Sequence, residues 1–392
     1  MDDNQYMTEE ELKSLIDSGQ DLNAADENGY TLLHKLVQNN DLNLIKILLD
    51  SNVNVKCFDK KGMTPLYFSL RLDNLEIARL LVAAGADVNL DHNGIYIPLH
   101  YAASNDNFEM MKFLLESGAN VNLQHRYLGT SLHCVVRRGN SIGLKMLLDA
   151  GADPNLRDCN NQTPLHYVAG RANIDIILIL LQTGLDINAV DNNGSTALSI
   201  ACNYNKIENM RIFLHAGADP NIKDKHNRTL IEYVKYLGAE IIAELLAAGV
   251  DHNYINGEGN TYLHMFARYG SVDQAKVLIE AGSTIDIQNR IGETALHIAV
   301  RLGYEFLVRY LLEVGFDPNI TNKNDKTVWD LIGLNKSIID LFKKYPRVVS
   351  LRTLCLRSVK NNKVDVSGLP HLLFLQPNEF EENESYLERQ TS

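Results

Sequence analysis

Residues 158–190 read DCNNQTPLHYVAGRANIDIILILLQTGLDINAV, and this stretch contains the signals for two helices and a turn. Thr163 is suited to cap the first helix, with Pro164 at its first position, where a missing N–H costs nothing. A second, strongly apolar helix is expected over 174–182. Gly184 is expected to end it, because glycine readily adopts the left-handed conformation that closes helices. The stretch therefore predicts a helix–turn–helix unit followed by an extended turn, here called a finger, that leads to the next unit.

The same unit recurs along almost the whole chain of 392 residues, at a step of 33 residues with one step of 32. Its threonine register comprises Thr31, Thr64, Ile97, Thr130, Thr163, Thr196, Thr229, Thr261, Thr294 and Thr327, with isoleucine once in place of threonine. One unit cannot bury both of its apolar faces, so neighbouring units must share a core. The paired apolar residues before each closing glycine, such as Leu147 and Leu148, are expected to form that core. The pattern predicts an all-α solenoid rather than separate globular domains.

A 33-residue period that carries Thr-Pro-Leu-His resembles the ankyrin repeat. The resemblance implies about ten helix-turn-helix repeats joined by finger turns. Residues 1–25 are expected to form a degenerate N-terminal cap helix, and residues 26–345 the ankyrin repeats. The approximate units are 26–58, 59–91, 92–124, 125–157, 158–190, 191–223, 224–255, 256–288, 289–321 and 322–345. A one-residue deletion near the start of a second helix, after Gly238, explains the single short step.

Six histidines occupy the fourth position of the Thr-x-Leu-His motif, namely His34, His100, His133, His166, His264 and His297. Neighbouring repeats are separated by about 8–10 Å, so adjacent histidines are too far apart to share a metal ion. In ankyrin repeats this histidine bonds the capping threonine and nearby backbone, and the same structural role is expected here. The Asp-x-Asn pairs, such as Asp186 and Asn188, are expected to bond local backbone in the fingers. The sequence holds no catalytic motif set, so the chain is expected not to be an enzyme and to need no cofactor or metal.

The composition disfavours several classes of partner. The formal net charge is −12, which disfavours nucleic acid because phosphate contacts require clustered lysine and arginine. No signal peptide is recognisable and no apolar run approaches 18 residues, so no membrane span is expected. The five cysteines are widely spaced and include no Cys-x-x-Cys pair, which is typical of reduced thiols. The expected compartment is cytoplasmic or nuclear.

The end of each first helix carries the sites that vary most between ankyrin repeats, four and five residues beyond the histidine position. In this acidic chain those sites hold Arg71, Arg137, Arg138, Arg171, Tyr204, Tyr236, Arg268, Tyr269 and Arg301. Arginine and tyrosine dominate interface hot spots, so these residues predict a surface for an acidic or phosphorylated protein substrate. The alternative is that the arginines are only solvated helix formers. Replacing Arg137 and Arg138 by glutamate is expected to abolish substrate capture and to leave the fold intact.

The period stops after Tyr345, and the following segment has a different pattern. Leu351, Leu354, Cys355 and Val359 fall on one stripe of a short helix. The spacing resembles the elongin-binding start of a SOCS box, which has Ser-Leu, three residues, a cysteine, three more residues and then an aliphatic residue. Leu369-Pro370 stands where that family contacts a cullin, but His371 and Leu372 replace the last two positions of the fuller Leu-Pro-aliphatic-Pro pattern.

The whole chain therefore resembles the ankyrin-repeat and SOCS-box proteins, with a helical SOCS-box-like module at 346–378 and an acidic tail at 379–392. The resemblance implies an adaptor whose repeats hold a protein substrate and whose box recruits elongin B/C and a cullin, of the cullin-5 class, within a RING ubiquitin ligase. Two alternatives remain. One is a plain ankyrin scaffold whose C-terminal segment caps the solenoid, and the other is an ankyrin effector with an F-box-like tail.

Overall fold

The computed structural model describes residues 7–90, 94–235, 237–332 and 335–344, and over these residues the secondary structure is helical, with two isolated β-bridges and no strand. The chain divides into two compact units, called here the first unit and the second unit. The first unit comprises residues 1–237 and 247–250, and the second comprises 238–246 and 251–392. The division falls in the repeat with the 32-residue step. There the first helix, α14 (Leu230–Val234), has only 5 residues.

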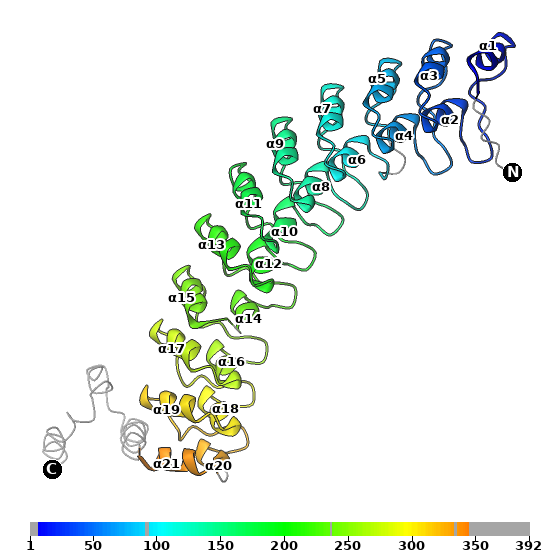
Figure 1. Cartoon of the computed structure of the whole chain (residues 1–392). Coiled ribbons are helices and arrows are strands. Elements are labelled where there is room, and N and C mark those ends of the chain that lie inside the picture. The colour runs from blue at the N-terminus through cyan, green and yellow to red at the C-terminus, as the bar shows by residue number, and fades with distance from the viewer. Residues whose placement is uncertain (1–6, 91–93, 236, 333–334, 345–392) are drawn as a thin grey trace, which may run out of the picture. The chain divides into compact units, whose positions relative to one another are not determined.

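The first unit repeats a pair of antiparallel helices. It opens with α1 (Glu9–Asp17). The first helices of its repeats are α2 (Leu32–Gln38), α4 (Pro65–Arg71), α6 (Pro98–Ser104), α8 (Ser131–Arg138), α10 (Pro164–Ala169), α12 (Ala197–Asn203) and α14. Their partners are α3 (Leu42–Leu49), α5 (Leu75–Ala83), α7 (Phe108–Glu116), α9 (Ser141–Asp149), α11 (Ile174–Leu181) and α13 (Ile207–His215). In this unit the first helices follow one another in one row and their partners in a second row (Figure 1).

The second unit has the same construction. It contains most of α15 (Ala239–Ala247), then α16 (Tyr262–Tyr269), α17 (Val272–Glu280), α18 (Ala295–Leu302) and α19 (Glu305–Glu313). A shorter pair, α20 (Val328–Leu331) and α21 (Lys336–Lys344), follows. Among the described residues, none of the helices is both long and apolar enough to cross a membrane.

The core lies between the repeats, as the apolar pattern predicts. The leucine of the Thr-x-Leu-His motif is at most 3% exposed wherever it occurs, at Leu33, Leu66, Leu99, Leu132, Leu165, Leu198, Leu263 and Leu296. Of the paired apolar residues in the second helix, one member is fully buried and the other is generally half-exposed, as with Leu147 and Leu148. Successive residues of an α-helix point about 100° apart, so only one of them can face the neighbouring repeat. The expectation that both members of each pair form the core was therefore too broad.

The helix ends agree closely with the sequence analysis. Thr163 precedes α10 in an extended conformation, and Pro164 is its first residue. Helix α11 ends at Leu181, one residue before the expected end, and Gly184 has a φ of 70° as predicted. In α9 the amide of Ala152 donates to the carbonyl of Leu147 across the left-handed Gly151, which satisfies carbonyls that the helix leaves open.

Candidate protein-binding surface

In the six repeats that carry it, the motif histidine joins its repeat to the next. The Nδ1 atom of His166 accepts the amide N–H of Thr163 at 3.1 Å, so the proton of the neutral ring is on Nε2. That Nε2–H donates to the carbonyl of Ser195 in the following finger, at 3.1 Å. His133 makes the same bond to the carbonyl of Gln162, and His264 to that of Glu293. Burial lowers the pKa of these imidazoles, which keeps them neutral. The expected structural role is confirmed.

The Asp-x-Asn pairs bond the finger backbone, as expected, and they also connect successive fingers. Asp186 Oδ1 accepts the amide of Asn188 at 3.0 Å. Asn155, one repeat earlier, accepts the amide of Asp186 at 2.8 Å. Asn188 in turn accepts the amide of Asp219, also at 2.8 Å. This ladder holds each finger at a fixed distance from its neighbours.

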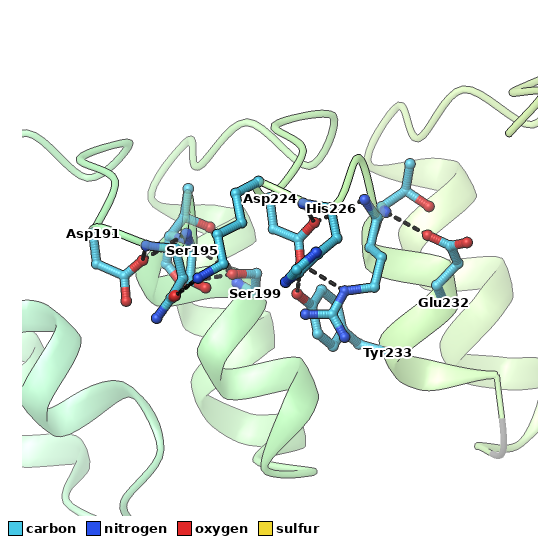
Figure 2. A network of polar contacts seen from close by, with 12 residues as sticks. Asp191, Ser195, Ser199, Asp224, His226, Glu232 and Tyr233 are labelled. Atoms are coloured by element: carbon cyan, nitrogen blue, oxygen red, sulfur yellow. Dashed lines mark hydrogen bonds and ion pairs between the residues drawn. The ribbon is translucent and has the colours of Figure 1, made fainter. Parts of the chain in front are cut away.

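A second network fixes the aspartate at the start of several fingers. Asp224 accepts the amides of His226 and Arg228 with Oδ1, and the hydroxyl of Tyr233 with Oδ2 at 2.7 Å (Figure 2). Arg228 Nε donates to the same Oδ2 at 2.6 Å, and its guanidinium lies 5.0 Å from the centre of the Tyr233 ring. Donors on every side offset the burial of this carboxylate and lower its pKa to about 2. Asp191 shows a simpler form in the preceding repeat, where its Oδ1 accepts the amides of Asn193 and Ser195 and its Oδ2 accepts the side-chain amide of Gln162. Ser199 accepts the amide of Thr196 and donates its hydroxyl to the carbonyl of the same residue.

The tyrosine bond of this network is present in two repeats and missing in a third. Tyr167 donates to Asp158 Oδ2 at 2.7 Å from nine positions later, as Tyr233 does to Asp224. In the second repeat the corresponding pair is Phe68 and Asp59, and Asp59 Oδ2 is buried without a hydrogen-bond partner among the described residues. Phe68 packs edge-on against the motif histidine of the preceding repeat, the placement that Tyr167 also has. Only the hydroxyl is absent.

Arg137 and Arg138 form the C-terminal end of α8, where positive charge is favourable against the helix dipole. Gly139, at φ 82°, ends the helix directly after them. The two side chains differ in their surroundings. Arg138 pairs with Asp106 of the preceding repeat at 3.1 Å, whereas the guanidinium of Arg137 has no ion pair with any residue that the structure describes. Arg138 therefore already has an ion-pair partner within the described part of the protein, whereas Arg137 does not.

Arg171 and Tyr204 lie beside Arg137 in the next two repeats. Arg171 follows the end of α10, and its Nη1 donates to the carbonyl oxygen of Arg137 at 2.7 Å. Tyr204 caps α12 and its ring covers Gly170, where an added Cβ would lie 3.0 Å from Tyr204 Cδ2. Tyr204 is 63% exposed although it packs on backbone in this way. The structure thus brings these three predicted residues together.

The remaining predicted site residues are separate or have structural contacts. The guanidinium of Arg71 lies 5.7 Å from the centre of the Phe68 ring. Arg301, in the second unit, makes a bidentate pair with Glu293, with distances of 3.1 and 2.9 Å. Because Glu293 is only 6% exposed, Arg301 has a structural role there. Arg268 and Tyr269 lie exposed at the end of α16.

Tyr236 lies outside the described residues, as do the proposed elongin contacts Leu351, Leu354, Cys355 and Val359 and the proposed cullin contacts Leu369 and Pro370. The sequence analysis missed the clamp of Asp224, Arg228 and Tyr233. Its signal is a tyrosine nine residues after a finger aspartate, with an arginine four residues after the same aspartate.

A family model agrees with the repeated helix pairs. The family model described as ankyrin repeats (3 copies) matches this chain in four places, at residues 4–92, 90–158, 132–224 and 230–322. The curated proteins include no match. Among solved structures, the chain is similar to a crystallised ankyrin repeat domain from Acinetobacter baumannii AYE, with 28% identity over 48% of this chain and 98% of that one, at a TM-score of 0.45. The family model spans well over half of the sequence, including most of the helix pairs and the histidine bonds described above, and the chain belongs to the ankyrin-repeat family.

Proposed function

We propose that this protein is a non-catalytic scaffold whose repeats bind another protein. The observation that carries the proposal is the group formed by Arg137, Arg171 and Tyr204. The motif histidines and finger aspartates are buried in the contacts between repeats, whereas these three side chains lie at helix ends, the two arginines form no ion pair within the described residues, and Tyr204 is 63% exposed. Arginine and tyrosine at such positions favour recognition of an acidic or phosphorylated protein surface.

We further propose that the scaffold is the substrate receptor of an elongin B/C–cullin–RING ubiquitin ligase. The support is the sequence pattern around Leu351 and Cys355, which directly follows the last helix pair. In that arrangement the protein performs no bond chemistry itself. It holds substrate lysines close to a loaded ubiquitin-conjugating enzyme and so raises their effective concentration.

Co-expression of the full chain with elongin B/C tests the second proposal. Stable co-purification is expected, and it should be lost when Leu351→Ala is combined with Cys355→Phe. Leu356→Ala is a matched control, because Leu356 lies off the helical stripe that carries the two anchors. Failure of the unaltered chain to co-purify would contradict the ligase role and favour a plain scaffold. Binding to a cullin-1-type adaptor instead would favour the F-box-like alternative.

A further inference from the structure

Two arginines of the first unit stand side by side without a neutralising carboxylate. Arg171 donates to the backbone carbonyl of Arg137 rather than to an acid, and neither guanidinium forms an ion pair within the described part of the chain. The finger carboxylate of Asp158 accepts the Tyr167 hydroxyl and backbone amides, and it forms no ion pair with either arginine. The protein, of net charge −12, thus carries two neighbouring arginines without a salt-bridge partner among the described residues.

A tyrosine ring extends this charged surface into the next repeat. Tyr204 rests on Gly170, immediately before Arg171, with the side chain of Ile200 also against that glycine position. Packing against backbone fixes the ring, so little side-chain entropy remains to be lost when a ligand covers it. We call the group of Arg137, Arg171 and Tyr204 the Arg–Tyr strip.

The spacing of the strip determines which ligand fits it. The backbone positions of its three members lie in three successive repeats, whose packed helices are about 8–10 Å apart, and the Arg171 side chain reaches back to the end of α8. An extended peptide advances about 3.3 Å per residue, so three residues span about one repeat. Side chains at every third position of such a peptide would therefore meet successive members of the strip.

We propose that the Arg–Tyr strip binds an extended peptide segment with two carboxylate side chains three residues apart and an apolar side chain three residues further on. The carboxylates pair with Arg137 and Arg171, and the apolar side chain lies on Tyr204. This inference rests on the proposed scaffold function and deepens it, because it gives the partner's recognised segment a chemistry and a spacing.

Fluorescence anisotropy with the full chain and labelled 12-residue peptides tests the proposal. The probes are Gly/Ser peptides containing Glu-x-x-Glu-x-x-Phe, in both chain directions, and the reference has the same composition with adjacent glutamates. A spaced peptide is expected to bind more tightly than the reference. Each of Arg137→Gln and Arg171→Gln should weaken its binding about tenfold, since a charged hydrogen bond contributes on the order of that factor.

Arg138→Gln is the matched control, because Arg138 is adjacent but already paired with Asp106. It should leave peptide binding within about twofold of the unaltered protein. Gly170→Ala adds a second test, because the backbone there has a negative φ of −85° that alanine tolerates, while the new methyl group displaces the Tyr204 ring. Gly170→Ala should weaken the binding of the spaced peptide several-fold without lowering the melting temperature of the protein.

Equal binding of spaced and adjacent glutamates would overturn the proposal, as would the same loss in Arg138→Gln as in the other two arginine variants. Recognition of a phosphoserine peptide alone would also overturn it. The outcome is separable from the ligase proposal, since elongin co-purification depends on Leu351 and Cys355 and not on the strip. Elongin binding without peptide binding would remove the strip inference and leave the adaptor role standing.

Discussion

Gly184 and Gly194 provide a matched test of what holds neighbouring fingers together. Both have left-handed backbones, with φ values of 70° and 74°. A Cβ atom at Gly184 would meet nothing within 4 Å, whereas one at Gly194 would lie 2.8 Å from the backbone nitrogen of Lys225. That nitrogen donates to the carbonyl of Asn193 at 2.8 Å, which is a backbone bond between fingers. Alanine at these two positions therefore separates conformational strain from loss of an inter-repeat contact.

The expected magnitudes differ enough to be measured. Placing an L-residue in the left-handed region costs about 1–2 kcal/mol, and this is the whole expected loss for Gly184→Ala. For Gly194→Ala the displaced finger adds about 1–3 kcal/mol for overpacking and about 1 kcal/mol for the weakened hydrogen bond. Together with the backbone strain, the total expected loss in the free energy of unfolding is about 3–6 kcal/mol.

Asparagine should rescue the position. Asn161 occupies the equivalent place in the preceding finger at φ 63°, where its Nδ2 donates to the carbonyl of Val190 at 3.0 Å. The bond between those two fingers is kept there, with the amide of Asn192 3.0 Å from its acceptor. Gly194→Asn is therefore expected to cost less than about 2 kcal/mol, because asparagine is the non-glycine residue that best tolerates this backbone.

Urea denaturation of the full chain, followed by far-ultraviolet circular dichroism, gives all three free energies. The glycine reasoning would be refuted by equal losses in Gly184→Ala and Gly194→Ala. Finding that asparagine at position 194 is no better than alanine would refute the rescue and assign the loss to the clash of the added Cβ atom with the next finger rather than to backbone strain.

Three further predictions concern buried polar groups. Phe68→Tyr should raise the free energy of unfolding by about 1 kcal/mol in urea titrations, because its hydroxyl would reach the unpaired oxygen of Asp59, and an unchanged midpoint would contradict this. Stability should fall as the pH drops below 6.5, since burial lowers the folded-state pKa of the motif histidines and their contribution is complete only above the unfolded-state value. Denaturation at pH 7.5 and 5.5 should show a smaller pH dependence in His166→Ser, and an identical slope would count against a histidine origin. Arg301→Gln should cost about 1–2 kcal/mol by leaving the Glu293 carboxylate buried without its bidentate partner, and a loss no greater than that of an unpaired surface arginine would argue against the structural role.

The architecture could be predicted from the sequence because the same helix-start and turn residues recur in each repeat. Thr163 and Pro164 fix a helix start, and Gly184 fixes a left-handed turn, through local conformational preferences that need no knowledge of neighbours. The motif histidine could also be assigned, since its partner lies at a constant position in the next repeat. Helix α11 shows the limit of this approach, as its last turn depends on packing and ends one residue earlier than its apolar sequence suggests.

The candidate surface was less accessible to sequence reasoning. Arg137 and Arg138 are neighbours of the same type at equally variable positions, yet only Arg138 meets a carboxylate. Its partner Asp106 is 32 residues away, in a turn outside the repeated motif. Arg301 was likewise predicted as a binding residue because the sequence does not reveal that Glu293 faces it. Partner choice of this kind depends on how repeats stack and which rotamers they allow.

The histidine bond gives the array a direction. His166 completes its hydrogen bonds only with the carbonyl of Ser195, 29 residues further along the chain. During synthesis from the N-terminus, the first helix of such a repeat therefore lacks this hydrogen bond until most of the next repeat has been made. Loss of a repeat from the C-terminal side removes the acceptor of the last remaining motif histidine and uncovers its ring, whereas loss from the N-terminal side removes only a donor from a finger carbonyl. Truncations from the two ends should for this reason be unequal, with the growing end the more fragile.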